Sequence, residues 1–360
     1  MKKIYILTET YPTETSKYQM AFIHPRIKGY INEGLDVRVI SFRAKNDYVY
    51  EGVSVLTKKS GEIRLGQENE IILMSHSPNL RHHIPFIRKW DDKISNLILF
   101  FHGHESLPLR NYYPKPFKFD RKGQFNYLFH FLYDPVKLWG LKKFITQRLI
   151  KGNTELIYVS EWFKNEALKC IGLDYTDNVH VHVINNGLNP YIKEGNYRLS
   201  EKKADFIAIR PIDRANCAIE TIAQFAQNHP DCSFHVYGKG NYFKYNPQPA
   251  NLKLISEFIS PKDMPSLLNH YSYAIIPTHQ DTQGVMMCEM ALHGIPTLVS
   301  DLPICHEMLD KYPNVKFISN DNFDCKVEDI PKPLTITVDR FSYDSTIGKE
   351  IELLLNTLKG

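Results

Sequence analysis

The sequence predicts an α/β protein made of two doubly wound halves, each a mostly parallel sheet covered by helices. Short β-branched runs alternate with helical patterns along the chain, as they do in βαβ units. The alternation stops in a polar stretch at 189–203 and then restarts. A length of 360 residues is long for one hydrophobic core and suits two domains.

The first half begins with an apolar run at 3–8, which is typical of a strand. Helical spacing follows at 18–33 and stops at Gly34. The run before Glu161 leads directly into a helix. Further strands are expected where β-branched and aromatic residues cluster, at 37–41, 97–101, 156–160 and 181–187.

The second half repeats this pattern. Strands are expected at 205–210, 233–237, 273–276 and 297–300, and helices at 218–228, at 264–271 and after Gly284. The predicted domains are therefore 1–188 and 189–345. The remaining segment, 346–360, is expected to form a helix that packs back on the first domain.

Composition excludes several classes of protein. The 44 Lys or Arg and 40 Asp or Glu residues leave a net charge of +4, too mild to indicate nucleic-acid binding. The six cysteines form no CxxC pair, so neither a zinc site nor a disulfide scaffold is expected, and a reduced cytoplasm suits them. The apolar run at the start ends at Thr8 and Glu9, too early for a signal peptide. No run approaches the ~20 apolar residues of a membrane span.

Ligands of open α/β sheets bind beyond the carboxyl ends of the strands. The stretch 277–296, PTHQDTQGVMMCEMALHGIP, follows such a strand end. If a helix starts near Gly284, the free backbone N–H groups of Gln283, Gly284 and Val285 form an anion site with the helix dipole.

Two acidic residues belong to this unit. Glu289 lies five residues after Gly284, about 7.5 Å along a helix axis, which is roughly the reach from a diphosphate to its ribose. A carboxylate there could accept two hydrogen bonds from a ribose diol. Asp281 would face the group that the distal phosphate carries. Alternatively Asp281 is a helix cap and Glu289 a solvated residue. The apolar helix around Glu289 favours the functional interpretation, because buried glutamates need partners.

The pattern of this unit resembles the signature of retaining family 4 glycosyltransferases. It has Asp281 and Glu289 with seven residues between them, Gly284 in fourth place and a later A-x-x-G-x-P. These enzymes have the GT-B fold, in which two Rossmann-like domains face each other across a cleft. Three further stretches resemble family motifs: VINNG at 183–187, SFHVYGKG at 233–240 and VSEWF at 159–163. One departure is the loop 9–16, which lacks the glycines that many relatives have there.

The resemblance implies roles for individual residues. Arg210 matches an arginine that binds the donor diphosphate, and Arg214 takes the place of a lysine usually found one residue later. His102, with His104 as a weaker choice, matches a histidine between sugar and diphosphate. Gly238 and Ile259 match the region of the nucleotide base. His102 and Asp281 would be the catalytic pair, in a retaining reaction by front-face attack.

The expected donor is a nucleoside diphosphate sugar, with UDP favoured over GDP, and no cofactor. No metal is expected, because no Asp-x-Asp motif or His/Cys cluster follows a strand. The expected acceptor is a carbohydrate, lipid-linked in bacterial capsule or O-antigen-like polysaccharide assembly. Two alternatives remain open: a GT-B nucleotide-sugar epimerase, and a non-catalytic GT-B-like partner subunit.

The segment 110–151 differs from the rest of the chain. It contains ten Lys or Arg, two Asp or Glu and eleven aromatic residues. This composition suits an anionic membrane surface, which would make the protein peripheral on the inner face of the cytoplasmic membrane. A helix packed on its own domain explains one apolar stripe equally well, that of Leu138, Leu141, Ile145 and Leu149. No nucleic-acid motif accompanies the charge.

Overall fold

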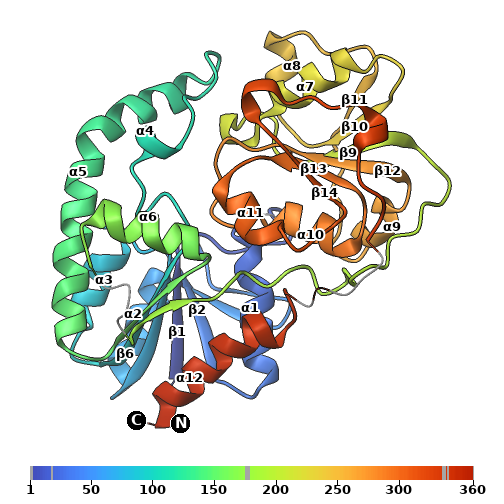
Figure 1. Ribbon diagram of the computed structural model, residues 1–360. Helices are drawn as coiled ribbons and strands as arrows, with labels where there is room; N and C mark the ends of the chain where they lie inside the picture. The colour runs from blue at the N-terminus through green and yellow to red at the C-terminus, as the bar shows by residue number, and fades with distance from the viewer. Residues whose placement is uncertain (1–2, 18, 175–178, 335–337, 339, 360) are drawn as a thin grey trace. The chain divides into compact units, whose positions relative to one another are not determined.

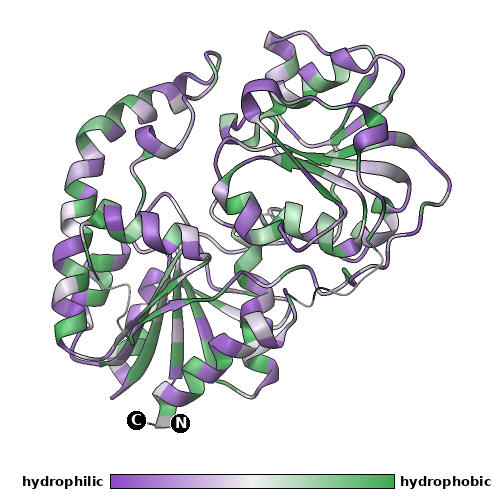
Figure 2. Cartoon of the chain, viewed as in Figure 1, coloured by the Kyte–Doolittle hydropathy of each residue, from purple (hydrophilic) through white to green (hydrophobic). Residues whose placement is uncertain are grey.

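The computed structural model describes the chain except residues 1–2, 18, 175–178, 335–337, 339 and 360, and the side chains of Ala21 and Lys359. The chain forms two compact units. The first contains Met1–Pro108, Tyr133–Gly187 and Phe341–Gly360, and the second contains Leu109–Leu132 and Leu188–Arg340. Each unit has its own sheet, and Figure 2 shows that the strands of both are mainly hydrophobic.

The first sheet has the order β3-β4-β2-β1-β5-β6-β7-β8. Only β3 runs antiparallel to its neighbour, and the other pairs are parallel. Its central strands are buried on both faces, as in other parallel sheets. The strands are β1 (Lys3–Thr8), β2 (Val37–Ser41), β3 (Tyr48–Tyr50), β4 (Val53–Thr57), β5 (Ile71–His76), β6 (Ile94–Phe101), β7 (Thr154–Tyr158) and β8 (Val181–Val183).

The helices of the first unit are α1 (His24–Asn32), α2 (Lys58–Gln67), α3 (His83–Lys89), α6 (Glu161–Ile171), α12 (Lys349–Lys359) and the later part of α5 (Arg121–Ile150). The helix expected at 18–33 is shorter at its start, because Pro25 fits only the first turn of a helix. The helix expected near Glu161 is confirmed, and Ser160 caps it by accepting a hydrogen bond from the Phe163 N–H.

The last helix is anchored by a buried ion pair. Arg26 of α1 donates from Nε to Glu350 of α12 at 2.8 Å, and both side chains are fully buried. Tyr30 also donates to Glu350, and Arg26 donates to Asn186 at 2.7 Å. These extra hydrogen bonds offset part of the cost of desolvating two charges. Figure 1 shows α12 beside α1.

The second sheet is entirely parallel, with the order β11-β10-β9-β12-β13-β14. Its strands are β9 (Ala204–Ile209), β10 (Phe234–Tyr237), β11 (Leu252–Ile255), β12 (Tyr271–Ile276), β13 (Thr297–Ser300) and β14 (Val315–Ile318). In Figure 1, α7 (Ile219–Asn228) lies on one side of this sheet, and α10 (Val285–His293) and α11 (Pro303–Leu309) lie on the other. Two shorter helices complete the core, α8 (Tyr242–Tyr245) and α9 (Met264–Leu268).

The segment 109–132, which the predicted bounds put in the first domain, packs on the second unit. It contains α4 (Leu109–Tyr112) and the start of α5. Phe117 contacts Tyr242 with ring centroids 4.9 Å apart, and Phe119 stacks on Tyr245 at 4.8 Å. Phe117 and Phe119 of this segment therefore have a structural role.

The later part of α5 packs on the first unit. Leu141 and Ile145 are buried, and Leu138 and Leu149 are half-buried. Packing on its own unit therefore accounts for the apolar stripe that the sequence singles out. Among the helices of the described residues, none is long and apolar enough to cross a membrane.

Candidate functional site

The carboxyl edge of the second sheet brings several loops together. The strands β9 and β10 end at this edge, followed by Arg210 and Gly238. A Cβ atom at Gly238 would lie 2.0 Å from the Arg210 carbonyl oxygen, so only glycine allows this approach. The backbone contact fixes where the arginine leaves the sheet.

The loop after β12 folds around one carboxylate oxygen. Asp281 Oδ1 accepts hydrogen bonds from the backbone N–H groups of Thr282, Gln283 and Gly284 at 2.7, 3.2 and 2.8 Å. Gly284 has φ = 70°, and α10 begins at Val285. The amides thus converge on an anion, as they do at phosphate-binding turns. In this structure Asp281 closes the turn, so a ligand oxyanion would compete with it for Gln283 and Gly284.

A second set of hydrogen bonds braces this loop. The Thr278 N–H donates to Ser300 Oγ at 2.8 Å, and Asn320 Nδ2 donates to the Thr278 carbonyl at 2.9 Å. Thr278 Oγ1 in turn donates to the Asn216 carbonyl at 2.9 Å. Loops after three strands are therefore held together, which keeps the amides in place.

Arg210 is the cation of this edge. Its guanidinium donates from Nη1 to the Pro277 carbonyl, while the buried Nε has no hydrogen-bond partner among the described residues. Burial lowers the Arg210 pKa, and the charges of Cys217, Asp281 and Glu220 oppose that effect. A buried N–H without an acceptor costs about 1–3 kcal/mol. An anionic ligand would supply the missing acceptor.

One predicted residue, Arg214, and three residues that were not predicted lie near the arginine in the second unit. Arg214 is exposed, and its charge reaches Cys217, whose pKa is raised by burial and lowered by both arginines. A hydrogen-bonded contact at the same edge was not predicted: His279 Nε2 lies 2.6 Å from Glu220 Oε1. His279 could have been predicted as a site residue, because it follows the carboxyl end of β12 closely.

Glu289 is buried on α10, and it has a partner. Its Oε1 accepts a hydrogen bond from the Asn189 backbone N–H at 2.9 Å. Burial raises the Glu289 pKa to about 7, and the Asn189 N–H opposes the shift. The residue is therefore not a solvated helix position, and its role with a ribose stays a prediction.

The two residues expected near the base lie after β10 and β11. Gly238 donates its N–H to the Ile255 carbonyl at 3.0 Å, and Ile259 is half-buried. Gly240 is needed here as well, because a Cβ atom on it would lie 2.6 Å from Asp213 Oδ1. Their role as a base site stays a prediction.

His102 belongs to the first unit and follows β6. Its ring Nε2 lies 2.9 Å from His76 Nδ1, and its backbone N–H donates to Glu105 Oε1. Its ring stacks on Phe100 with centroids 4.8 Å apart. Burial, with His76 and Arg26 nearby, holds the His102 pKa well below its usual value, so the ring is neutral at pH 7. His104 is exposed.

The predicted residues thus fall into two groups. Arg210, Arg214, Gly238, Ile259, the turn at 281–285 and Glu289 all belong to the second unit, and His102 belongs to the first. Among the described residues, no three His, Cys, Asp or Glu side chains gather as metal ligands. The expected absence of a metal stays a prediction.

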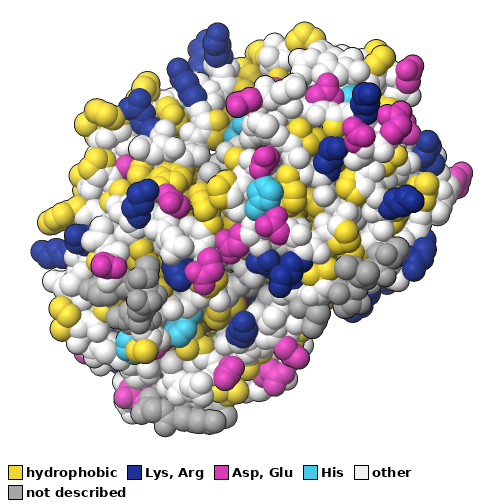
Figure 3. All heavy atoms as spheres, viewed as in Figure 1, with side chains coloured by type: hydrophobic (Ala, Val, Ile, Leu, Met, Phe, Trp, Pro, Cys, Tyr) yellow, Lys and Arg dark blue, Asp and Glu magenta, His cyan; other side chains and the backbone are white. Residues whose placement is uncertain are grey.

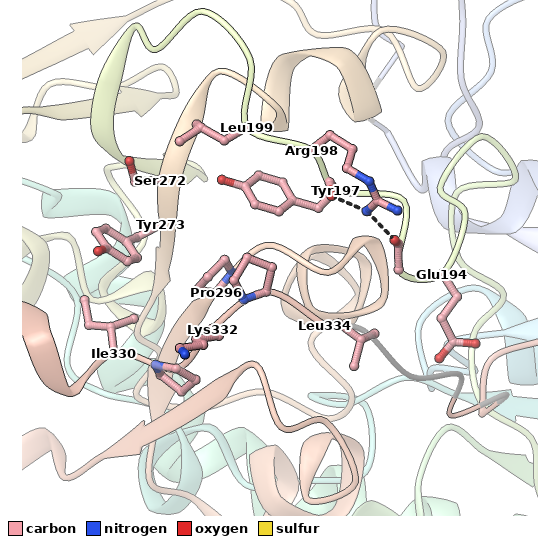
Figure 4. Close-up of a pocket in the computed structure, with 13 residues that line it drawn as sticks. Glu194, Tyr197, Arg198, Leu199, Ser272, Tyr273, Pro296, Ile330, Lys332 and Leu334 are labelled. Atoms are coloured by element: carbon pink, nitrogen blue, oxygen red, sulfur yellow. Dashed lines mark hydrogen bonds between the residues drawn. The ribbon is translucent and has the colours of Figure 1, made fainter.

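Pocket size alone does not locate this site. A pocket of about 770 Å³ lies at the amino edge of the second sheet, lined by Tyr273 of β12, by Pro296 before β13, and by 194–199 and 330–334 (Figure 4). None of the predicted site residues lines it. In the first unit, a pocket of about 520 Å³ lies beyond the ends of β1 and β2, and its lining includes Thr10, Tyr11, Arg43 and Tyr48. The glycine-poor first loop therefore helps to shape a pocket.

Two doubly wound parallel sheets in succession, with the last helix in the first unit, define the GT-B fold, as the sequence predicts. No model of a protein family matches the sequence, and no curated protein matches it. Similar solved structures exist, and they are GT-B glycosyltransferases.

Three of these structures illustrate the likeness. Sucrose-phosphate synthase from Thermosynechococcus elongatus has a TM-score of 0.66 at 9% identity, and the match covers 89% of this chain and 87% of that one. WaaG, a glycosyltransferase involved in lipopolysaccharide biosynthesis, has a TM-score of 0.57 at 10% identity over 99% and 90%. An S. aureus TarM mutant in complex with fondaparinux, α-GlcNAc-glycerol and UDP has a TM-score of 0.56 at 10% identity, covering 90% of each chain.

Proposed function

We propose that the protein is a retaining family 4 glycosyltransferase that moves a sugar from a nucleoside diphosphate sugar to a glycan acceptor. The observation that supports this most is the edge of the second sheet, where the unpartnered Arg210 Nε lies in the field of Asp281 and its amide turn. Such an arrangement suits a leaving diphosphate, whose negative charge grows in the transition state.

Each residue has a proposed task at this edge. Arg210, Arg214 and the amides of Gln283, Gly284 and Val285 hold the diphosphate, so Asp281 rotates away from the amides when the donor binds. Asp281 and the neutral His102 then orient the transferred sugar. Glu289 accepts hydrogen bonds from the ribose, and the base lies near Gly238 and Ile259. UDP is the favoured nucleotide, and the TarM complex with UDP supports that choice.

The proposed mechanism needs no metal and no protein nucleophile. The acceptor hydroxyl attacks from the face that the diphosphate leaves, so the new bond keeps the anomeric configuration. The departing diphosphate takes the acceptor's proton. Positive charge from Arg210 and Arg214 stabilises the diphosphate in a site from which water is excluded.

Calorimetry with UDP, GDP and their sugars, each with and without EDTA, tests the donor site. We expect UDP to bind more tightly than GDP, and chelation to change neither binding nor turnover. Product NMR should show the donor's anomeric configuration. A protein that epimerises the donor without an acceptor, or binds it without turnover, would be one of the two alternatives instead.

The finer proposal concerns the acceptor, which we infer to be lipid-linked in bacterial surface-polysaccharide assembly. One face of α5 carries large apolar side chains that are 51–74% exposed, at a spacing of three and four residues. This α5 stripe consists of Phe125, Leu128, Phe129, Leu132, Val136 and Trp139. Figure 3 shows hydrophobic and basic side chains gathered over the part of the surface where α5 lies in Figure 1.

The charges of α5 suit an anionic membrane. Arg121, Lys122, Lys142 and Lys143 are exposed. The helix's single acidic residue, Asp134, is buried 2.8 Å from Lys137. Lys137 also donates to the His104 and Leu107 carbonyls, and Arg148 binds Asp91, so these two cations brace the first unit and do not face a membrane. Attraction through the exposed cations is worth about 1 kcal/mol each near anionic lipid.

Liposome flotation tests the membrane proposal. Replacing Phe129, Leu132 and Val136 with serine, or Lys142 and Lys143 with glutamate, should release the protein from phosphatidylglycerol vesicles. The matched control is Lys58→Glu with Lys59→Glu on α2, an equal charge change at exposed sites on another helix. Equal flotation of all variants, or no flotation of the wild type at low salt, would refute a membrane role for the α5 stripe.

A further inference from the structure

Two histidines meet at the carboxyl edge of the first sheet. His76 is the last residue of β5, which pairs in parallel with β6, and His102 follows β6 directly. Their nitrogens His76 Nδ1 and His102 Nε2 lie 2.9 Å apart. In a contact between two neutral imidazoles, one nitrogen carries the proton and the other accepts it.

Both rings are neutral at pH 7. Burial, with Arg26 as a further cause, lowers the pKa of both histidines well below the usual value. Arg26 lies over Phe100 at 4.5 Å, and Phe100 stacks on His76 and His102 with centroids 5.0 and 4.8 Å away. The cation that acts on both rings is therefore a guanidinium that Glu350 holds in place.

The other titratable groups around the pair do not reverse this conclusion. His83 and His104 add a smaller lowering effect on His76 and His102 respectively. Glu105 Oε1 accepts hydrogen bonds from the backbone N–H groups of His102 and Gly103, and the buried Oε2 has no hydrogen-bond partner among the described residues. Burial and the neighbouring histidines all lower the pKa values of the two rings, so neither ring gains a second proton at pH 7.

The surroundings of His76 decide which nitrogen carries its proton. Its Nε2 is buried and has no hydrogen-bond partner among the described residues. A proton on Nε2 would bury an unsatisfied N–H in the field of the Arg26 cation. A lone pair on Nε2 is attracted by the same cation. The proton therefore belongs on Nδ1, the atom that contacts His102.

We propose that His76 is a positioning residue whose Nδ1–H donates to His102 Nε2 and so fixes His102 as the Nδ1–H tautomer. In that form Nε2 is occupied as an acceptor, and the ring proton is on Nδ1. His102 can then donate a hydrogen bond from Nδ1 to an oxygen of the donor sugar, and it cannot serve as a general base through Nε2. This role rests on the proposed function, whereas the tautomer itself does not.

Long-range ¹H–¹⁵N NMR of the full chain labelled with ¹⁵N-histidine measures the tautomer directly, with His102→Gln assigning the signals. We expect the wild type to show His102 protonated at Nδ1 near neutral pH. His76→Phe keeps a planar buried ring and removes the donor, so the His102 signal should change toward the Nε2–H form. His76→Asn supplies an amide N–H near the Nδ1 position and should restore the Nδ1–H form.

His83→Phe is the matched control, because His83 is buried in the same unit and bonds to Ser75 at 2.7 Å. It should leave the His102 tautomer unchanged. In transfer assays, His76→Phe should lower kcat by about tenfold, as the loss of an outer hydrogen-bond partner does at other sites. UDP affinity should be unchanged, and His76→Asn should recover part of kcat.

Two results would overturn the inference: an Nε2–H tautomer of His102 in the wild type, or an unchanged tautomer in His76→Phe. If His76→Phe fails to fold, the wild-type spectrum and His76→Asn still decide the question. An Nδ1–H tautomer in a protein that neither binds nor turns over nucleotide sugars would refute the proposed function and leave the tautomer established.

Discussion

The carboxyl edges of the two sheets occupy equivalent places in their doubly wound units and differ in chemistry. The edge of the first sheet has an aromatic cluster in which His76, His102 and Phe100 stack together, and the buried cation beside it, Arg26, is paired with Glu350. The edge of the second sheet has convergent amides and Arg210, whose buried Nε is unpartnered. A doubly wound sheet thus supplies a place for ligands, and the residues after its strands decide which ligand fits.

The two edges are therefore expected to have different roles in stability and in ligand binding. At the first edge the charge of Arg26 is balanced by Glu350, although Arg26 Nη2 and His76 Nε2 are buried without hydrogen-bond partners among the described residues. The second edge has a buried donor that needs an anion. We therefore expect substitutions at the first edge to affect stability or kcat without changing nucleotide affinity, and substitutions at the second edge to affect nucleotide binding or the departure of the diphosphate.

The largest expected effect is that of Glu350→Gln. Breaking a buried ion pair by removing one partner costs about 3–5 kcal/mol, because Arg26 would remain as an uncompensated buried charge. Chemical denaturation should show this loss, while UDP affinity measured under folding conditions stays the same. A stable variant with weaker UDP binding would contradict the division between the two edges.

Next is Arg210→Gln, which should lower kcat by about 100-fold, the usual loss when a transition-state donor is removed. The free energy of unfolding should fall little or rise, since an unsatisfied buried group is removed. The control is Arg198→Gln. Arg198 lines the pocket at the opposite edge of the same sheet, so its replacement should leave kcat unchanged.

An effect of intermediate size is expected for the pH dependence of stability and UDP binding that Glu289 causes. Its pKa is about 7, above the ordinary 4.5, so the folded protein holds a proton between these values that the unfolded chain has released. Stability should therefore fall as the pH rises from about 4.5 to 7. Ribose binding needs the carboxylate, so UDP affinity should increase as the pH rises through 7.

Glu289→Gln should remove both trends and weaken UDP binding by about 1–3 kcal/mol. Calorimetry at pH 6 and pH 8 measures the effect. The same affinity at both values in the wild type would remove Glu289 from the nucleotide site.

The smallest expected effect is that of Arg214→Gln. Arg214 is exposed, so solvent screens its charge, and its removal should weaken UDP binding by less than about 1 kcal/mol. A larger loss of UDP affinity would show that Arg214 moves into the site when the donor binds.

Much of the fold follows from local signals. The strands β1 and β9, the helix after Ser160 and the turn before α10 were predictable from the sequence. Each depends on β-branched runs, capping residues or glycines that affect only the backbone a few residues away. Bounds were less predictable, as at α1, where Pro25 starts the helix late. The strands β4, β5, β11 and β14 are among the elements that were not predicted from the sequence.

The sequence by itself determined the two doubly wound halves and the acidic residues of the unit at 277–296, because both depend on spacing along the chain. Only the tertiary structure decided that Asn189 contacts Glu289, that His76 contacts His102, and that Lys137 and Arg148 are buried. These contacts join residues far apart in sequence, and each depends on which strands become neighbours. Such a contact cannot be predicted from local composition, because it depends on how the whole unit packs.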